Sequence, residues 1–214
     1  MGESLNKAII FDFDGTLVNS EITINQCFQS ITSYLAPERV DYAKDILIGP
    51  PLRDTASEIL GPNHQDQLDE FVKKFIEMHD DHAIKNTQPY AGVIETLKKL
   101  SLKGISMAVA TNKRYAPTIK LINHFNWQKY FTFIECSDSQ SQIRNKDEMI
   151  QEILKYNAFT EAFFVGDTVN DGLSANLNQL PFILARYGYG RDQDWSKVNV
   201  KKDIQNFSEI LQLI

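Results

Sequence analysis

Two aspartates separated by one residue are the side chains of this sequence best placed to do chemistry. Asp12 and Asp14 follow the apolar residues 8–11 and precede Gly15, which favours a turn. Two carboxylates this close repel each other unless a cation lies between them or one of them holds a proton. A divalent metal removes that repulsion, and carboxylate oxygens suit Mg²⁺. The spacing therefore predicts a nucleophile, a proton donor and a metal ligand at one strand end, the simpler alternative being an Asp-Gly turn.

The composition is that of an ordinary soluble protein. The chain has 214 residues, of which 43% are hydrophobic and 23% charged, enough for one sizeable domain or a core with a small insert. The net charge of −6 and the lack of a Lys/Arg run argue against a nucleic-acid partner. No apolar stretch approaches the roughly 20 residues that span a bilayer, so no membrane partner is expected.

The N-terminal residues and the cysteines predict a cytoplasmic location. Residues 1–6 lack the basic region and the apolar core of a secretion signal. Cys27 and Cys136 are far apart in the sequence. A reducing compartment is therefore expected and a disulfide is not.

The hydrophobic periodicity changes along the chain. Residues 19–85 follow a helical pattern throughout, with a short helix expected over residues 41–48 and a longer one from Leu68 to about His82. The rest alternates helices with apolar strands, the expected strands being residues 7–13, 105–110, 131–136, 162–165 and 181–185. Strands separated by helices predict an α/β fold with a doubly wound, mostly parallel sheet. We expect residues 1–18 and 86–214 to form this α/β core and residues 19–85 to form an inserted all-helical domain.

Polar side chains follow the central strands of the predicted sheet. Thr111, Asn112 and Lys113 come directly after one strand, and residues 166–171 (GDTVND) come after another. Because parallel sheets bind ligands at the carboxyl ends of their strands, these residues are expected to lie near the two N-terminal aspartates. Between residues 113 and 166, Lys146 is the first residue of a predicted helix. The helix dipole makes this position unfavourable for a cation. An anion beside Lys146 would explain this placement.

These segments resemble the four motifs of the haloacid dehalogenase superfamily of phosphatases, in order and spacing over nearly the whole chain. Residues 12–16 (DFDGT) are similar to the first motif, residues 111–112 to the second, Lys146 to the third and residues 166–171 to the fourth. The helical insert resembles the type 1 cap of that superfamily. Three short strings are similar to phosphoglycolate-phosphatase-like members: residues 49–52 (GPPL), 111–113 (TNK) and 187–190 (YGYG).

Two positions depart from the pattern of the superfamily. Asn19 stands where an aspartate often follows the first motif, which lies outside the chemistry. Asp147 stands where a proline commonly follows the lysine of the third motif. Lys155 is an alternative for that lysine, although it lies in the middle of a predicted helix.

The resemblance implies a reaction through a covalent intermediate. Asp12 would attack phosphorus and form an aspartyl-phosphate, while Asp14 would protonate the leaving alkoxide and then deprotonate the attacking water. The implied cofactor is Mg²⁺, held by the Asp12 carboxylate, the Asp14 backbone carbonyl and Asp167. Asp171 would steady the waters on the metal.

The resemblance also implies which residues contact the substrate. The expected phosphate contacts are Thr111, Asn112 and Lys146, with Lys113 as a further cation and with Gly15 and Thr16 where the backbone approaches closely. Arg53, which follows the GPPL string, is a candidate for holding a second anionic group, the alternative being a solvated helix residue. Tyr187 and Tyr189 either pack a loop or face the substrate. Residues 79–82 (HDDH) are expected to form a solvated helix end rather than a metal site.

The predicted function is a Mg²⁺-dependent phosphatase that acts on a small phosphorylated metabolite, such as phosphoglycolate, as a monomer or weak homodimer. Alternatives on the same scaffold are a phosphomutase of the β-phosphoglucomutase type and a pyrophosphatase or nucleotidase. A 2-haloacid dehalogenase usually lacks a second acid two residues after the nucleophile, so Asp14 argues against it. A binding module without turnover would typically have lost the nucleophile, the acid or a metal aspartate, and all of these are present.

Overall fold

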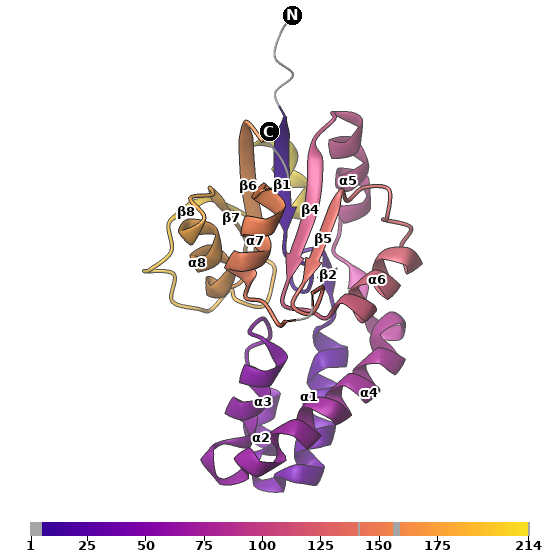
Figure 1. Ribbon diagram of the computed structural model, residues 1–214, viewed down its shortest axis with the longest axis vertical. Helices are drawn as coiled ribbons and strands as arrows, with labels where there is room; N and C mark the ends of the chain where they lie inside the picture. The colour runs from indigo at the N-terminus through magenta and orange to yellow at the C-terminus, as the bar shows by residue number, and fades with distance from the viewer. Residues whose placement is uncertain (1–5, 141, 156–158, 214) are drawn as a thin grey trace, which may run out of the picture.

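A six-stranded sheet forms the centre of the protein (Figure 1). The computed structural model describes residues 6–140, 142–155 and 159–213. The strands of the sheet are β1 (Lys7–Phe11), β4 (Ser106–Thr111), β5 (Phe133–Cys136), β6 (Glu161–Gly166), β7 (Phe182–Ala185) and β8 (Val200–Ile204). Their order is β5-β4-β1-β6-β7-β8, and every neighbouring pair is parallel. The strand order reverses beside β1, where open parallel sheets place their binding sites.

The central strands are buried on both faces of the sheet. Ile9 and Phe11 of β1 pack into one hydrophobic cluster, whereas Ile10 between them packs into a different one. Successive side chains of a strand point to opposite faces, so a strand covered on both sides is continuously apolar. Helices cover the two faces: α5 (Val93–Leu102), α6 (Tyr115–His124) and the 3₁₀ helix η3 (Phe207–Gln212) on one, and α7 (Lys146–Lys155) and α8 (Val169–Leu177) on the other. The doubly wound, mostly parallel sheet expected from the sequence is therefore confirmed.

A group of helices lies beyond the carboxyl ends of the strands (Figure 1). It contains α1 (Glu21–Leu35), α2 (Val40–Lys44), α3 (Leu52–Leu60) and α4 (Leu68–Asn86), with the 3₁₀ helices η1 (Pro37–Arg39) and η2 (Pro62–Gln67) between them. These helices bury a hydrophobic cluster of their own, in which the ring of Phe28 contacts those of Phe71 and Phe75. We call this group the helical unit.

Two connections join the helical unit to the sheet. The short strands β2 (Val18–Asn19) and β3 (Gln88–Pro89) pair in antiparallel fashion, so the outgoing and returning chains run side by side. Because every α1–α4 residue lies between these strands in the sequence, the helical unit is an insertion after the first strand of the sheet.

Several element boundaries differ from those expected. The first strand ends at Phe11 rather than residue 13, because the chain turns there and Leu17 N–H donates to Phe13 O at 2.9 Å. The helix expected over residues 41–48 ends at Lys44, and Ile48 packs into the helical unit from the loop that follows. The long helix α4 continues past His82 to Asn86. Strand β8 was not expected because its middle residues, 201–203, are polar and exposed, as befits an edge strand.

Both cysteines, Cys27 and Cys136, are buried and free, as expected from their separation in the sequence. Among the described residues, the structure has no helix that is both long enough and apolar enough to cross a bilayer.

Candidate active site

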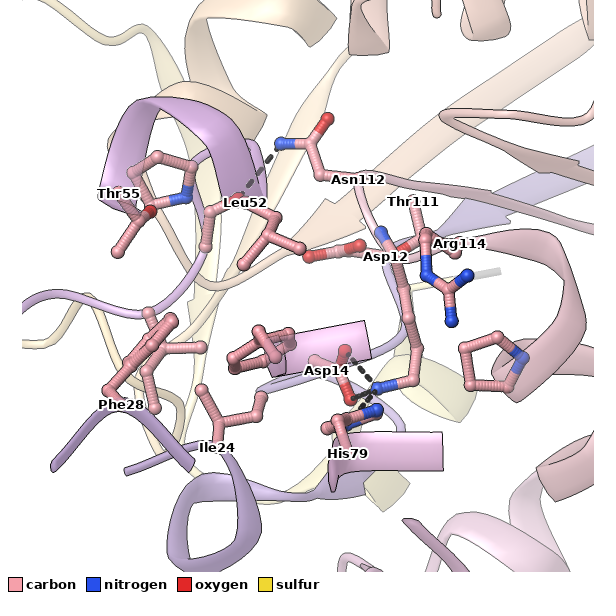
Figure 2. A pocket seen from close by; sticks show the side chains of 16 residues that line it. Asp12, Asp14, Ile24, Phe28, Leu52, Thr55, His79, Thr111, Asn112 and Arg114 are labelled. Carbon is pink, nitrogen blue, oxygen red and sulfur yellow. Dashed lines mark hydrogen bonds and ion pairs between the residues drawn. The ribbon is translucent and has the colours of Figure 1, made fainter. Parts of the chain in front are cut away.

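The carboxyl ends of the three central strands bring the predicted residues together. Asp12 follows β1, Thr111 ends β4 and Asp167 follows β6. Because β1 pairs with both β4 and β6, these three strand ends are adjacent. Figure 2 shows Asp12, Thr111 and Asn112 at one side of a pocket, and Ile24, Phe28 and Leu52 of the helical unit at the other. The pocket therefore lies between the sheet and the helical unit.

Lys146 lies at the first residue of α7 and joins two of the carboxylates. Its Nζ lies 3.0 Å from Asp12 Oδ1 and donates a hydrogen bond to Asp171 Oδ1. Its side chain is only 1% exposed. Burial by itself would lower the pKa of Lys146, but the two carboxylates raise it above its ordinary value, so the side chain stays charged. The anions offset the unfavourable position of this cation in the helix dipole.

Asp167 is held in place by the turn that follows β1. Thr16 Oγ1 donates to Asp167 Oδ1 at 2.8 Å, and the backbone N–H of Tyr189 donates to Asp167 Oδ2 at 2.7 Å. Gly15 has a φ of +81°, and a Cβ on it would lie 2.2 Å from Asp167 Oδ2. Glycine is therefore required here both by the backbone conformation and by the close approach of the carboxylate.

Asp171 is engaged by donors at both of its oxygens. Besides Lys146 at Oδ1, its Oδ2 accepts from Thr168 N at 2.8 Å, Thr168 Oγ1 at 2.7 Å and Asp167 N at 3.1 Å. Thr168 and Asp171 also form the capping box that begins α8. Asp171 thus anchors Lys146 and the start of α8.

The three carboxylates fit a divalent cation. Asp12, Asp167 and Asp171 each offer an oxygen within 4.8 Å of the others, and all three residues are buried. When they are ionised, Lys146 compensates only one of their three negative charges. Asp12 Oδ1 is buried and lies in the ion pair with Lys146. The two negative charges that Lys146 leaves uncompensated are what a hard divalent ion would satisfy.

The pKa values of Asp12 and Asp167 are raised, as expected for buried carboxylates whose negative charge is not fully compensated. Burial raises the pKa of Asp12 to about 7, with Asp171 adding to the effect and Lys146 opposing it. Burial, with Asp171 and Asp12 next in importance, raises the pKa of Asp167 well above its ordinary value. A cation bound between them would favour the ionised forms.

Asp14 faces the pocket, apart from the three clustered carboxylates. Its Oδ1 accepts from Ser20 Oγ at 2.6 Å, and Lys113 Nζ lies 2.9 Å from its Oδ2 and 3.2 Å from its Oδ1. The Lys113 side chain is 5% exposed. Thr111 Oγ1 in turn accepts from the backbone N–H of Lys113 at 3.2 Å, which holds the loop after β4 against this carboxylate.

Two residues predicted to contact substrate, Arg53 and Asn112, have partners within the protein. Arg53 is outside the pocket, with a side chain that is 55% exposed and paired with Asp69 at 2.7 Å. One residue of helix turns Arg53 about 100° away from Leu52, which lines the pocket. That Arg53 holds a second anionic group of the substrate stays a prediction. The side-chain amide of Asn112 donates to Gly49 O of the helical unit at 2.9 Å.

His79 belongs to the pocket, although the sequence interpretation placed it at a solvated helix end. It is 4% exposed, its ring stacks on Phe75 with centroids 5.3 Å apart, and its Nε2 lies 3.3 Å from Lys113 Nζ (Figure 2). Burial and the nearby Lys113 lower the pKa of His79 to about 3. The spacing of Phe71, Phe75 and His79 continues one apolar helix face, a signal that could have placed this histidine.

The YGYG segment packs and positions neighbouring groups. Tyr187 donates its hydroxyl to Thr16 O at 2.9 Å, and its ring lies 4.8 Å from that of Tyr90. The hydroxyl of Tyr189 accepts from Ser20 N at 2.8 Å. Neither tyrosine lines the pocket described above.

Comparison with known proteins agrees with this arrangement. The model of the haloacid dehalogenase-like hydrolase family matches residues 9–185. The chain belongs to this family. Within it, the chain is 30% identical to the pyrophosphatase PpaX of Listeria monocytogenes serotype 4a, over 76% of this chain and 75% of that protein. It is 27% identical to a phosphoglycolate phosphatase of Rhodobacter capsulatus, over 85% of each chain.

Solved structures show the same fold. A crystal structure of a predicted phosphoglycolate phosphatase from Haemophilus somnus superimposes with a TM-score of 0.84 at 22% identity, covering 99% of both chains. A haloacid dehalogenase-like hydrolase, SP0104 of Streptococcus pneumoniae, superimposes with a TM-score of 0.82 at 23% identity, covering 96% of this chain and 97% of that one.

Proposed function

We propose that this protein is a Mg²⁺-dependent phosphatase that hydrolyses a small phosphomonoester through an aspartyl-phosphate on Asp12. The observation that carries the proposal is the buried Asp12 carboxylate, which lies beside Lys146 and two further buried carboxylates at the wall of a pocket. Membership of the hydrolase family and the phosphatase names of relatives support the same chemistry.

The metal site would consist of the side chains of Asp12 and Asp167 and the backbone carbonyl of Asp14. Bound Mg²⁺ would compensate the excess negative charge and stabilise the charge that develops on the phosphoryl oxygens. Asp171 would act by holding Lys146 and the backbone N–H groups of residues 167 and 168 in place. Thr16 would orient Asp167 through the hydrogen bond to its Oδ1.

In the first chemical step, an Asp12 oxygen would form a bond to phosphorus as the bond to the leaving oxygen breaks. Lys146, fixed by Asp171, would reduce the repulsion between the nucleophile and the phosphate dianion. Asp14 would give its proton to the leaving alkoxide, and Ser20 and Lys113 hold its carboxyl group at the pocket for that purpose. In the second step, Asp14 would take a proton from the water whose oxygen bonds to phosphorus as the Asp12–phosphorus bond breaks, which releases phosphate and restores the Asp12 carboxylate.

The helical unit would act as a cap over the site. We propose residues 19–85 as the cap and residues 1–18 with 86–214 as the catalytic core, because the paired strands β2 and β3 are the junction between them. Substrate would enter between the two parts, and closure would exclude bulk water while Asp12 attacks phosphorus. The free, buried cysteines support a cytoplasmic location.

Pyrophosphate hydrolysis is a second candidate, favoured by the 30% identity to PpaX. The same nucleophile and metal site would serve, with phosphate in place of an alkoxide as the leaving group.

Phosphate release from p-nitrophenyl phosphate tests the proposed function. We expect turnover with Mg²⁺, loss of turnover with EDTA, and recovery when Mg²⁺ is restored. Asp12→Asn should lower kcat by more than about a thousandfold, since it removes the nucleophile. Asp192→Asn is the matched control, because the Asp192 side chain is 95% exposed. An active Asp12→Asn enzyme, or wild type without any turnover, would show the proposal to be wrong.

A further inference from the structure

The wall that the helical unit contributes to the pocket carries no charged side chain among the described residues that line it. Its apolar side chains are those of Ile24, Phe28, Ile48, Leu52 and Phe75. Figure 2 shows Ile24, Phe28 and Leu52 turned toward the space in front of Asp12 and Asp14. This wall faces the side of the pocket where the leaving group of a phosphoester bound at Asp12 would lie.

The polar groups of this wall are uncharged and already have partners. Thr55 Oγ1 donates to Pro51 O at 3.3 Å. His79 Nε2 lies 3.3 Å from the ammonium group of Lys113, which can only donate, so Nε2 accepts and the proton of the neutral ring is on Nδ1. The lowered pKa of His79 keeps the ring neutral at physiological pH.

The two cations of the loop after β4 are also paired. Lys113 lies against both oxygens of Asp14. Arg114 Nη2 contacts both oxygens of Asp80, at 2.6 and 2.5 Å. A carboxylate or a second phosphate on a leaving group that lies against the apolar wall would meet no cation of that wall, and burying a charge without a partner is unfavourable by several kcal/mol.

The pocket has a volume of about 80 Å³ and is partly open to solvent. The phosphoryl group would occupy part of this volume, at Asp12 and Thr111. The remainder accommodates a leaving group of a few carbon atoms against the apolar wall.

From this arrangement we infer that the natural substrate is the phosphomonoester of a compact, uncharged alcohol whose carbon atoms contact the apolar wall. The inference rests on the proposed function and separates this chain from relatives named for phosphoglycolate and pyrophosphate. It assigns the leaving-group specificity to Leu52 and its apolar neighbours, with no cation involved.

The test compares kcat/KM for two substrates of similar shape. Isobutyl phosphate and 2-phosphoglycolate differ in that two methyl groups of the first replace the two carboxylate oxygens of the second. We expect isobutyl phosphate to be at least tenfold better, and pyrophosphate to be at least tenfold poorer than isobutyl phosphate. A wild-type enzyme that hydrolyses phosphoglycolate or pyrophosphate as well as or better than isobutyl phosphate would overturn the inference while leaving the proposed function intact.

The two substrates differ in intrinsic reactivity, and this difference cancels when the ratio of their turnover is compared between a variant and the wild type. Leu52→Arg places a cation on the wall and should raise the ratio of phosphoglycolate to isobutyl phosphate turnover at least tenfold. Asp54→Asn changes the net charge of α3 by the same one unit on an exposed residue and should leave the ratio unchanged. An unchanged ratio in folded Leu52→Arg would also overturn the inference. If no substrate, including p-nitrophenyl phosphate, yields phosphate with wild type, the proposed function itself fails.

Discussion

Replacing His79 with glutamine should make the protein less sensitive to acid. His79 is buried against Phe75, and its ring faces the ammonium group of Lys113 on one side and Asp80, 3.7 Å away, on the other. Arg114 is paired with the same Asp80. Burial and Lys113 disfavour a proton on His79, so its pKa is about 3 in the folded protein and about 6.5 in the unfolded chain. Glutamine keeps an acceptor for Lys113 but does not titrate.

The size of the effect follows from the two pKa values. Between pH 6.5 and 3 the unfolded state binds more protons at this residue than the folded state, so the free energy of unfolding decreases as the pH falls. Each pH unit well inside this window is worth about 1.4 kcal/mol. Between pH 7 and pH 5, His79 should remove about 2 kcal/mol of stability from the wild type, and none from His79→Gln.

Urea unfolding at pH 7 and pH 5, followed by tryptophan fluorescence, measures this difference. Other titrating groups are common to both proteins, so the comparison isolates residue 79. His82→Gln is the matched control: His82 is exposed three residues further along α4, and this variant should keep the steeper wild-type dependence. If wild type and His79→Gln lose the same free energy between the two pH values, within about 0.5 kcal/mol, the neutral buried state of His79 is refuted.

Three further substitutions test the site and its surroundings. Gly15→Ala should destabilise the protein by at least about 1 kcal/mol in thermal unfolding, since it forces a Cβ toward Asp167 at a positive φ; unchanged stability would contradict the close approach. Thr16→Val removes the hydrogen bond to Asp167 and should weaken Mg²⁺ binding by about 10- to 100-fold in calorimetric titration, an unchanged affinity being the contrary result. Arg53→Ala should change stability by less than about 1 kcal/mol and leave the order of preferred substrates the same, because its pair with Asp69 is exposed; a reordered substrate panel would return Arg53 to the pocket.

The strand ends that carry the site could be predicted because their signals are local. A continuous apolar run such as residues 8–11 reports a strand covered on both faces, and the polar residues that follow mark its carboxyl end. Once three such strands are parallel neighbours, Asp12, Thr111 and Asp167 must lie at one edge. The edge strand β8 had no such signal, because its polar side chains resemble those of a loop.

The placement of His79 and Arg53 depended on neighbours from distant parts of the chain. His79 is buried because the end of α4 packs near the loop after β4, which brings Lys113 against it across 34 residues of sequence. Arg53 turns away because helix rotation gives the pocket to Leu52 and Thr55 instead. The spacing of Phe71, Phe75 and His79 puts the histidine on the apolar face of α4, but it does not identify Lys113 as the group that this face meets.

The sequence by itself determined the fold class, the insertion of the helices after the first strand and the family, since periodicity is a local property and the order and spacing of motifs can be read along the chain without its fold. Only the tertiary structure decided the charge balance of the pocket. Lys146 meets Asp171 across 25 residues, and Lys113 meets Asp14 across 99. Electrostatic interactions depend on distance and burial in space, so which cations are paired and how much negative charge stays uncompensated emerges only when these segments come together.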